Sequence, residues 1–191
     1  MINITDCLQE IVAHVCRNVP IYSHIDPDQI MVCFAKSRKK TMHGIYAKVC
    51  PTRFPGGKKS VVHRGREFSY PTIMVGSNQI LYVIYFYYPR FQDLTFETKL
   101  LTIFHELYHI SPRFDGHIRR FPGKNYQHGH SKEAFDEPLK QVIADYIATY
   151  RDEELLEVLK LDFKQLQEEF GRIEGQTMQM PKAFAVMRTE D

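Results

Sequence analysis

The fold is decided by the stretch Leu100-Leu101-Thr102-Ile103-Phe104-His105-Glu106-Leu107-Tyr108-His109-Ile110. Its apolar residues recur at the spacing typical of one buried face of an α-helix. That face consists of Leu100, Ile103, Phe104, Leu107 and Ile110. The opposite side is nearly uncharged and carries Thr98, Leu101, Thr102, His105 and His109. A solvated face would carry Lys and Glu instead, so the helix is expected to pack one face on a core and to line a site with the other.

The two histidines enclose a glutamate in the pattern H-E-x-x-H. Residues four apart on a helix lie one turn above each other, with Cβ atoms about 5–6 Å apart. This spacing lets His105 and His109 bind one Zn²⁺ ion, each at about 2.0–2.1 Å. Glu106 then lies beside the open coordination position, where it can take a proton from water. The pattern predicts His105 and His109 as metal ligands and Glu106 as a general base.

A catalytic zinc site uses three protein ligands, so one more is expected after the motif. Asp115 lies where the metzincin pattern has its third ligand, but Pro112 occupies the position at which that pattern needs glycine. Downstream carboxylates, Glu133 or Glu137, are further candidates, whereas His117 is expected to be a loop residue.

The cluster His128-Gly129-His130-Ser131 is the best candidate because it directly precedes an expected helix start. Gly129 permits a backbone turn there that a Cβ would hinder. We favour His128 as the third ligand over His130.

The motif, the following loop, His128-Gly129 at a helix start and the aromatic Phe135 together resemble the pattern of SprT-like zincins. In that group a histidine followed by glycine and a helix is the third zinc ligand. The stretch from Phe104 to Pro112, with Phe114-Asp115-Gly116 and Arg119-Arg120-Phe121, is similar to metallopeptidases of bacteria and phages. The resemblance covers about residues 94–136 and implies a minimal zincin-like domain that hydrolyses peptide bonds. SprT and Spartan proteins act near DNA, and Spartan cleaves proteins crosslinked to it.

The rest of the chain predicts an α+β fold. A helix is expected from Ile4 to Val15, followed by strands at 30–35, 45–50, 68–75 and 80–88, with Ser77-Asn78-Gln79 as the turn between the last two. The motif helix should run from a cap at Thr95 to Ser111, before Pro112, and an irregular loop should span 112–130. Another helix should begin at Ser131 or Asp136, with shorter helices at 152–160 and 162–170 and a strand at 183–187.

We expect one domain over residues 1–191. An N-terminal helix and a small mixed or antiparallel sheet (1–90) would pack against the metal-site helices (94–150), and C-terminal helices with a tail (151–191) would close the site. The cleft should lie between the sheet edge and the motif helix.

Composition and cysteine usage indicate a folded cytoplasmic protein. Hydrophobic residues make up 43% of the 191 residues, and no apolar run approaches the length of a membrane span. The N-terminus lacks the basic-then-apolar order of a secretion signal. The four cysteines (Cys7, Cys16, Cys33 and Cys50) form no C-x-x-C pair, so they are expected to be buried reduced thiols.

Charge is distributed unevenly along the chain. Residues 36–66 contain ten Lys or Arg and no acid, whereas 152–174 are rich in acids. The basic span could bind DNA or another polyanion weakly and without sequence preference, or it could be a set of solvated charges near a sheet edge.

The sequence therefore predicts zinc-dependent hydrolysis of a protein or peptide substrate, with Glu106 as the base. Tyr108, Tyr126, Arg119 and Arg120 are candidates to stabilise the oxyanion, and the sequence does not select among them. The alternative is a nucleic-acid-associated binding module with a structural or vestigial metal site. Retention of Glu106 favours the enzyme, because a structural site has no use for a base between its ligands.

Overall fold

The computed structural model describes residues 1–36, 44–121 and 131–186 and has the predicted α+β fold. The helices are α1 (Ile4–Asn18), α2 (Phe96–Tyr108), α3 (Lys132–Tyr150), α4 (Glu157–Lys160) and α5 (Phe163–Phe170), with 3-10 turns η1 (Pro20–Tyr22), η2 (Pro27–Gln29), η3 (Pro55–Gly57) and η4 (Glu154–Leu156). The strands are β1 (Ile2–Asn3), β2 (Ile30–Lys36), β3 (Ala47–Pro51), β4 (Ser60–His63), β5 (Arg66–Ser69), β6 (Met74–Val75), β7 (Asn78–Gln79), β8 (Tyr82–Tyr88), β9 (Ile173–Glu174) and β10 (Phe184–Ala185).

The central sheet has the order β2-β8-β3. Strand β8 runs parallel to β2 and antiparallel to β3, so the sheet is mixed, as predicted. The aromatic and β-branched sequence of β8 suits the middle position, where both faces of a strand are covered. Strand β3 is an edge strand of this sheet.

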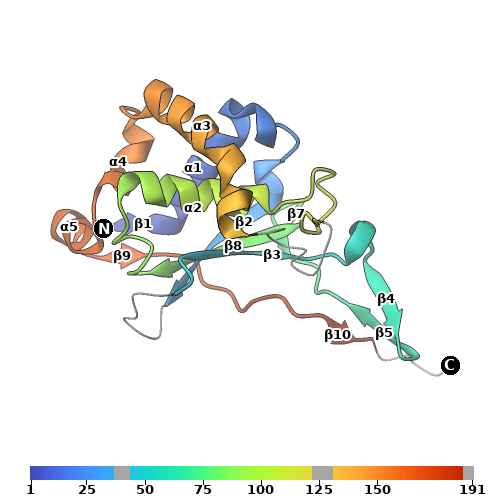
Figure 1. Ribbon diagram of the computed structural model, residues 1–191. Helices are drawn as coiled ribbons and strands as arrows, with labels where there is room; N and C mark the ends of the chain where they lie inside the picture. The colour runs from blue at the N-terminus through green and yellow to red at the C-terminus, as the bar shows by residue number, and fades with distance from the viewer. Residues whose placement is uncertain (37–43, 122–130, 187–191) are drawn as a thin grey trace.

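Helices cover one face of the central sheet (Figure 1). Val32, Ile84 and Val49 point from the three strands into the core that α1, α2 and α3 share. Figure 1 shows the C-terminal segment running along the other face of the sheet. There Cys33, Tyr85 and Cys50 form a second, smaller core, against which Met178 and Met180 of that segment pack. The sheet is therefore buried on both faces.

Most helix boundaries follow local signals. Asn3 caps α1, its side chain accepting the N–H groups of Thr5 and Asp6, and Ser131 caps α3 by accepting the N–H of Ala134. Of the two predicted starts for α3, Ser131 is therefore confirmed. Asp162 forms a capping box with Gln165, and α5 ends at Phe170, as predicted, with Gly171 directly after it.

Two predictions were wrong in detail. The strand expected at 68–75 is broken, because β5 ends at Ser69 just before Pro71, which cannot donate to a ladder. Asn78–Gln79, expected as part of a turn, pairs instead as β7 with β6. The expected strand at 183–187 exists as the short β10, which pairs antiparallel with β5.

The cysteine prediction is confirmed except for the burial of Cys7. All four thiols are unpaired; Cys16, Cys33 and Cys50 are buried and Cys7 is half-buried. Burial raises the pKa of the Cys33 thiol to about 11, so this sulfur stays protonated at neutral pH. In the described ranges, no helix has the length and apolar character needed to cross a membrane.

Candidate active site

Helix α2 separates a core face from a cavity face, as its sequence predicts. Thr95 caps the helix by accepting the N–H of Thr98. The predicted core residues Leu100, Ile103, Phe104, Leu107 and Ile110 are fully buried. The other side lines a cavity of about 520 Å³ with Thr98, Leu101, Thr102, His105, Glu106 and His109. Strand β3 and the residues before it (44–49) form another wall of this cavity. The cleft thus lies between the sheet edge and the motif helix, where it was expected.

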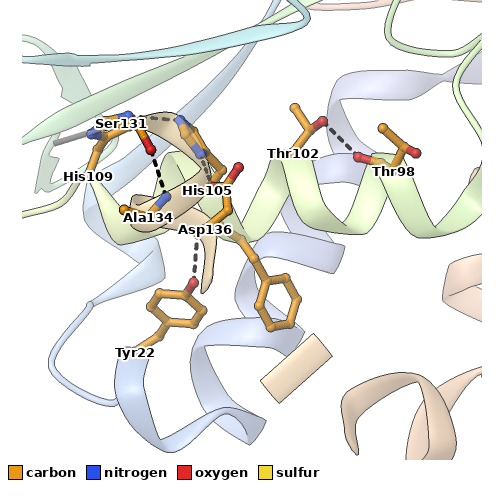
Figure 2. A network of polar contacts seen from close by, with 9 residues as sticks. Tyr22, Thr98, Thr102, His105, His109, Ser131, Ala134 and Asp136 are labelled. Atoms are coloured by element: carbon orange, nitrogen blue, oxygen red, sulfur yellow. Dashed lines mark hydrogen bonds and ion pairs between the residues drawn. The ribbon is translucent and has the colours of Figure 1, made fainter. Parts of the chain in front are cut away.

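The two histidine side chains converge in the cavity. Nε2 of His105 lies 3.1 Å from Nε2 of His109, and both residues are buried (Figure 2). Two nitrogens bound at about 2.0–2.1 Å to one tetrahedral ion lie about 3.3 Å apart. The observed separation is close to that value, so the pair fits one metal ion without rearrangement of the helix.

Asp136 of α3 lies behind His105. Its Oδ1 is 2.5 Å from His105 Nδ1 (Figure 2), and the residue is 8% exposed. An ionised carboxylate only accepts hydrogen bonds, so Nδ1 carries the hydrogen. In a neutral imidazole this leaves Nε2 with the lone pair that a metal ion needs.

Sequence reasoning treated Asp136 only as a possible helix start, and it missed this contact. The position of Asp136 in the sequence nevertheless indicates a buried carboxylate. Asp136 lies on the same helical face as Leu139, Ile143 and Tyr146, all of which are buried. A carboxylate on a core-facing stripe requires a partner.

Glu106 lies between the two histidines in sequence and at the cavity wall in space. Its Oε2 accepts the backbone N–H of Val49 at 2.7 Å. Val49 belongs to β3, whose outer edge is not paired with another described strand, so this N–H is available to α2. The contact fixes the carboxylate beside the histidine pair and connects the motif helix to the sheet.

The motif helix ends at Tyr108, three residues before the predicted Ser111. Arg119 explains the early end. Its backbone N–H donates to the carbonyl of His109 at 2.6 Å, and its Nε donates to the carbonyl of Tyr108 at 2.8 Å. Two carbonyls that a helix end leaves without intrahelical partners are thereby satisfied from a later segment.

These contacts involve Arg119 and Tyr108, two of the residues predicted as candidates to stabilise the oxyanion. The Arg119 guanidinium lies 4.1 Å from the centre of the Tyr108 ring, and the centre of the Phe135 ring lies 4.9 Å from it. Neither Arg119 nor Tyr108 lines the cavity. Arg120 is exposed and also lies outside the cavity wall, and Tyr126 falls outside the described residues.

Two of the candidate third ligands, His128 and His130, lie outside the described residues. Asp115 Oδ1 accepts the N–H of His117 at 3.2 Å, and the residue packs against Gly57 away from the cavity. Glu137 is exposed and forms an ion pair with Lys140. Within the part of the chain that is described, no three His, Cys, Asp or Glu side chains group as a metal site.

The beginning of α3 contacts the histidine pair directly. The Phe135 ring centre lies 4.8 Å from that of His105 and 4.6 Å from that of His109. Residues 128–130 therefore precede a helix whose first turn touches both imidazoles.

Comparison with known proteins agrees with this geometry. No curated protein and no solved structure matches the chain. Residues 3–164, which include α2, α3 and the central sheet, match the family described as "Putative phage metallopeptidase". The chain belongs to this metallopeptidase family.

Proposed function

We propose that the protein is a zinc-dependent peptidase that hydrolyses peptide bonds of a protein substrate. The observation that carries the proposal is the convergence of His105 and His109 at 3.1 Å in a cavity, with Asp136 behind one ring and Glu106 beside the pair. The family supports a metal-dependent peptidase in general terms.

His105, His109 and His128 would hold the metal ion in this proposal. Two imidazoles with a third nitrogen ligand suit Zn²⁺ and leave a fourth position open. When bound, zinc polarises a carbonyl oxygen and lowers the pKa of water toward ~7. His128-Gly129 directly before α3 supports a place near the SprT-like zincins, in which such a histidine is the third ligand.

Glu106 would act as the general base. Its carboxylate lies at the cavity wall, held by the Val49 N–H through Oε2. It would accept the proton of the attacking water and pass it to the leaving amine. Asp136 would keep His105 in the tautomer whose Nε2 faces the cavity.

The substrate would lie in the cleft between β3 and α2. The wall formed by Thr98, Leu101 and Thr102 carries no charge. This part of the cavity suits an uncharged substrate side chain.

The test combines metal analysis with a hydrolysis assay on the full-length protein. Zinc content and cleavage of an unfolded protein such as reduced casein are measured for the parent, His105→Ala and Glu106→Gln. The proposal expects about one zinc per chain in the parent and in Glu106→Gln, little in His105→Ala, and cleavage by the parent alone. Cleavage that persists in metal-free protein would contradict it.

A nucleic-acid-associated module with a structural metal site is the alternative. The buried Glu106 carboxylate at the cavity wall favours the peptidase, because a charge placed there has a cost that a purely structural site would not require.

A further inference from the structure

Strands β4 and β5 and the turn between them form a ribbon over residues 58–69. Figure 1 shows β4 and β5 extending away from the helices and the central sheet. Strand β10 pairs with Phe68 and Ser69, and the N–H of Val186 donates to the carbonyl of Glu67 at 2.8 Å. Among the described residues, the His63–Arg66 pair and the turn beyond it have no third strand beside them, and this end projects from the body of the molecule (Figure 1).

The ribbon carries exposed cations that have no carboxylate partner among the described residues. They are Lys58, Lys59, Arg64 and Arg66. In the C-terminal half, by contrast, four cations pair with nearby acids. Those pairs are Lys140–Glu137, Lys160–Glu157, Lys164–Glu168 and Arg172–Glu174. Within the described residues, no ion pair neutralises the positive charge of the ribbon.

The ladder places Arg66 and Glu67 on opposite faces of the ribbon. His63 and Arg66 are directly opposite in the ladder and therefore share a face. Glu67, the only acid of the ribbon, points to the other face, where its carboxylate accepts the hydroxyl hydrogen of Ser60 at 2.6 Å. Arg64 and Gly65 both have positive φ, 50° and 73°, as a tight hairpin turn requires. The end of the ribbon is accordingly a short, well-defined basic tip.

The cations form two groups, Lys58 with Lys59 at the base and Arg64 with Arg66 at the tip. Four residues lie between Lys59 and Arg64, so their Cα atoms are about 16 Å apart along an extended chain. The major groove of B-form DNA is about 12 Å wide and admits a two-stranded ribbon. Long Lys and Arg side chains at the two ends could then each reach one phosphate backbone.

We propose that the β4–β5 ribbon binds duplex DNA in the major groove, through phosphate contacts from Lys58, Lys59, Arg64 and Arg66. The contacts are electrostatic, so binding is independent of sequence. B-form DNA is the expected partner rather than duplex RNA, because the major groove of RNA is deep and narrow. None of the four residues lines the cavity, so this inference is independent of the proposed hydrolysis.

The test measures binding of the full-length protein to a fluorescent duplex of about 30 base pairs by anisotropy, over about 20–200 mM salt. Four phosphate contacts predict an affinity loss of about 100-fold between 50 and 200 mM salt. The ribbon variant is Lys58→Gln, Lys59→Gln, Arg64→Asn and Arg66→Gln combined, with Asn chosen because it tolerates positive φ. It should bind at least about 100-fold more weakly at 50 mM salt.

The matched control removes the same number of charges from the helical half: Lys140→Gln, Lys160→Gln, Lys164→Gln and Arg172→Gln. It should change the affinity by less than about threefold, because these four cations are exposed, already paired with acids and screened by salt from DNA bound elsewhere. Lys59→Gln and Arg66→Gln alone should each lower the salt slope by about one, a readout that loss of folding would not mimic.

Several results would overturn the inference. One is that the protein shows no detectable binding to the DNA duplex at about 20 mM salt. Another is that the control variant weakens DNA binding as much as the ribbon variant does. A third is that the protein binds duplex RNA as tightly as duplex DNA. The protein could also bind phosphatidylserine vesicles, with the same loss of affinity in the ribbon variant. That result would show that the ribbon binds anionic surfaces in general and not the DNA groove.

Discussion

The carboxylate of Asp136 accepts a hydrogen bond from Nδ1 of His105 at 2.5 Å, and this bond connects α3 to the motif helix α2. Both groups are buried, so water competes little with the contact. The bond fixes the His105 ring in the orientation that directs Nε2 at His109. Asp136 therefore acts on the site through the histidine rather than through a contact of its own with a substrate.

Replacing Asp136 should weaken zinc binding. Asp136→Ala removes the acceptor and is expected to lower zinc affinity by about 10–100-fold, while Asp136→Asn keeps an acceptor and should have a smaller effect. Competition with a chromogenic chelator measures the dissociation constant. Glu137→Gln is the control, because Glu137 is the exposed neighbour. Equal zinc affinity in Asp136→Ala and the parent would show that Asp136 does not support zinc binding.

The third ligand is testable by paired variants of two neighbouring histidines. His128→Ala should lose most of its zinc, because two imidazoles alone hold the ion weakly. His130→Ala should retain about one zinc per chain. Metal analysis after gel filtration measures the zinc content of both variants. Full zinc occupancy in His128→Ala together with loss of zinc in His130→Ala would show that His130 is the third ligand.

Arg119 should matter for stability rather than for chemistry. Its Nε bond to the Tyr108 carbonyl and its contact with the Tyr108 ring stabilise the end of α2. Arg119→Ala is expected to lower the free energy of unfolding by about 1 kcal/mol, since a part-buried carbonyl loses a charged donor. Urea unfolding measures this, with exposed Arg113→Ala as the control. A catalytic defect in Arg119→Ala without any loss of stability would restore Arg119 as an oxyanion candidate.

Much of the fold was predictable because its signals are local. The cap at Thr95, the two-faced pattern of α2 and the capping box at Asp162 depend on residues within one helical turn. Features set by distant contacts were not predictable. The end of α2 depends on Arg119, ten residues beyond the motif, and β1 exists only because Ile2 pairs with Ile173. The Asp136 contact also joins two helices, although an acid in an apolar stripe indicated that some partner was needed.

Lys99 provides a pH-dependent test of the core. It is buried, and its Nζ donates to the carbonyls of Leu159 and Leu161 at 2.9 and 2.6 Å. Burial lowers the pKa of Lys99 from 10.5 to about 8, although Asp162 and Asp93 act in the opposite direction. The folded state therefore disfavours the charged amine relative to the unfolded chain. This cost is fully present below pH 8 and is relieved as the pH rises from about 8 to about 10.5.

The comparison is between the parent and Lys99→Met, with urea unfolding at several pH values. The difference in free energy of unfolding should shift in favour of the parent by up to about 3 kcal/mol between pH 7 and pH 10.5. The control is Lys140→Met, because Lys140 is exposed and pairs with Glu137 at the surface. Its difference from the parent in free energy of unfolding should not change by this amount over the same pH range. A difference that is independent of pH would mean that the Lys99 amine titrates normally.

The central claim is that the Glu106 carboxylate is the general base at a metal held by the histidine pair, and Glu106→Gln tests it most directly. Gln keeps the size of the side chain but cannot accept a proton, and Glu106→Asp with a shortened carboxylate is the companion variant. The decisive measurement is zinc content together with the rate of cleavage of an unfolded protein by the same samples. We predict about one zinc per chain in parent and Glu106→Gln, with a cleavage rate about 10²–10⁴-fold lower in the variant. Cleavage by Glu106→Gln at the parent rate would contradict the mechanism, whatever its zinc content.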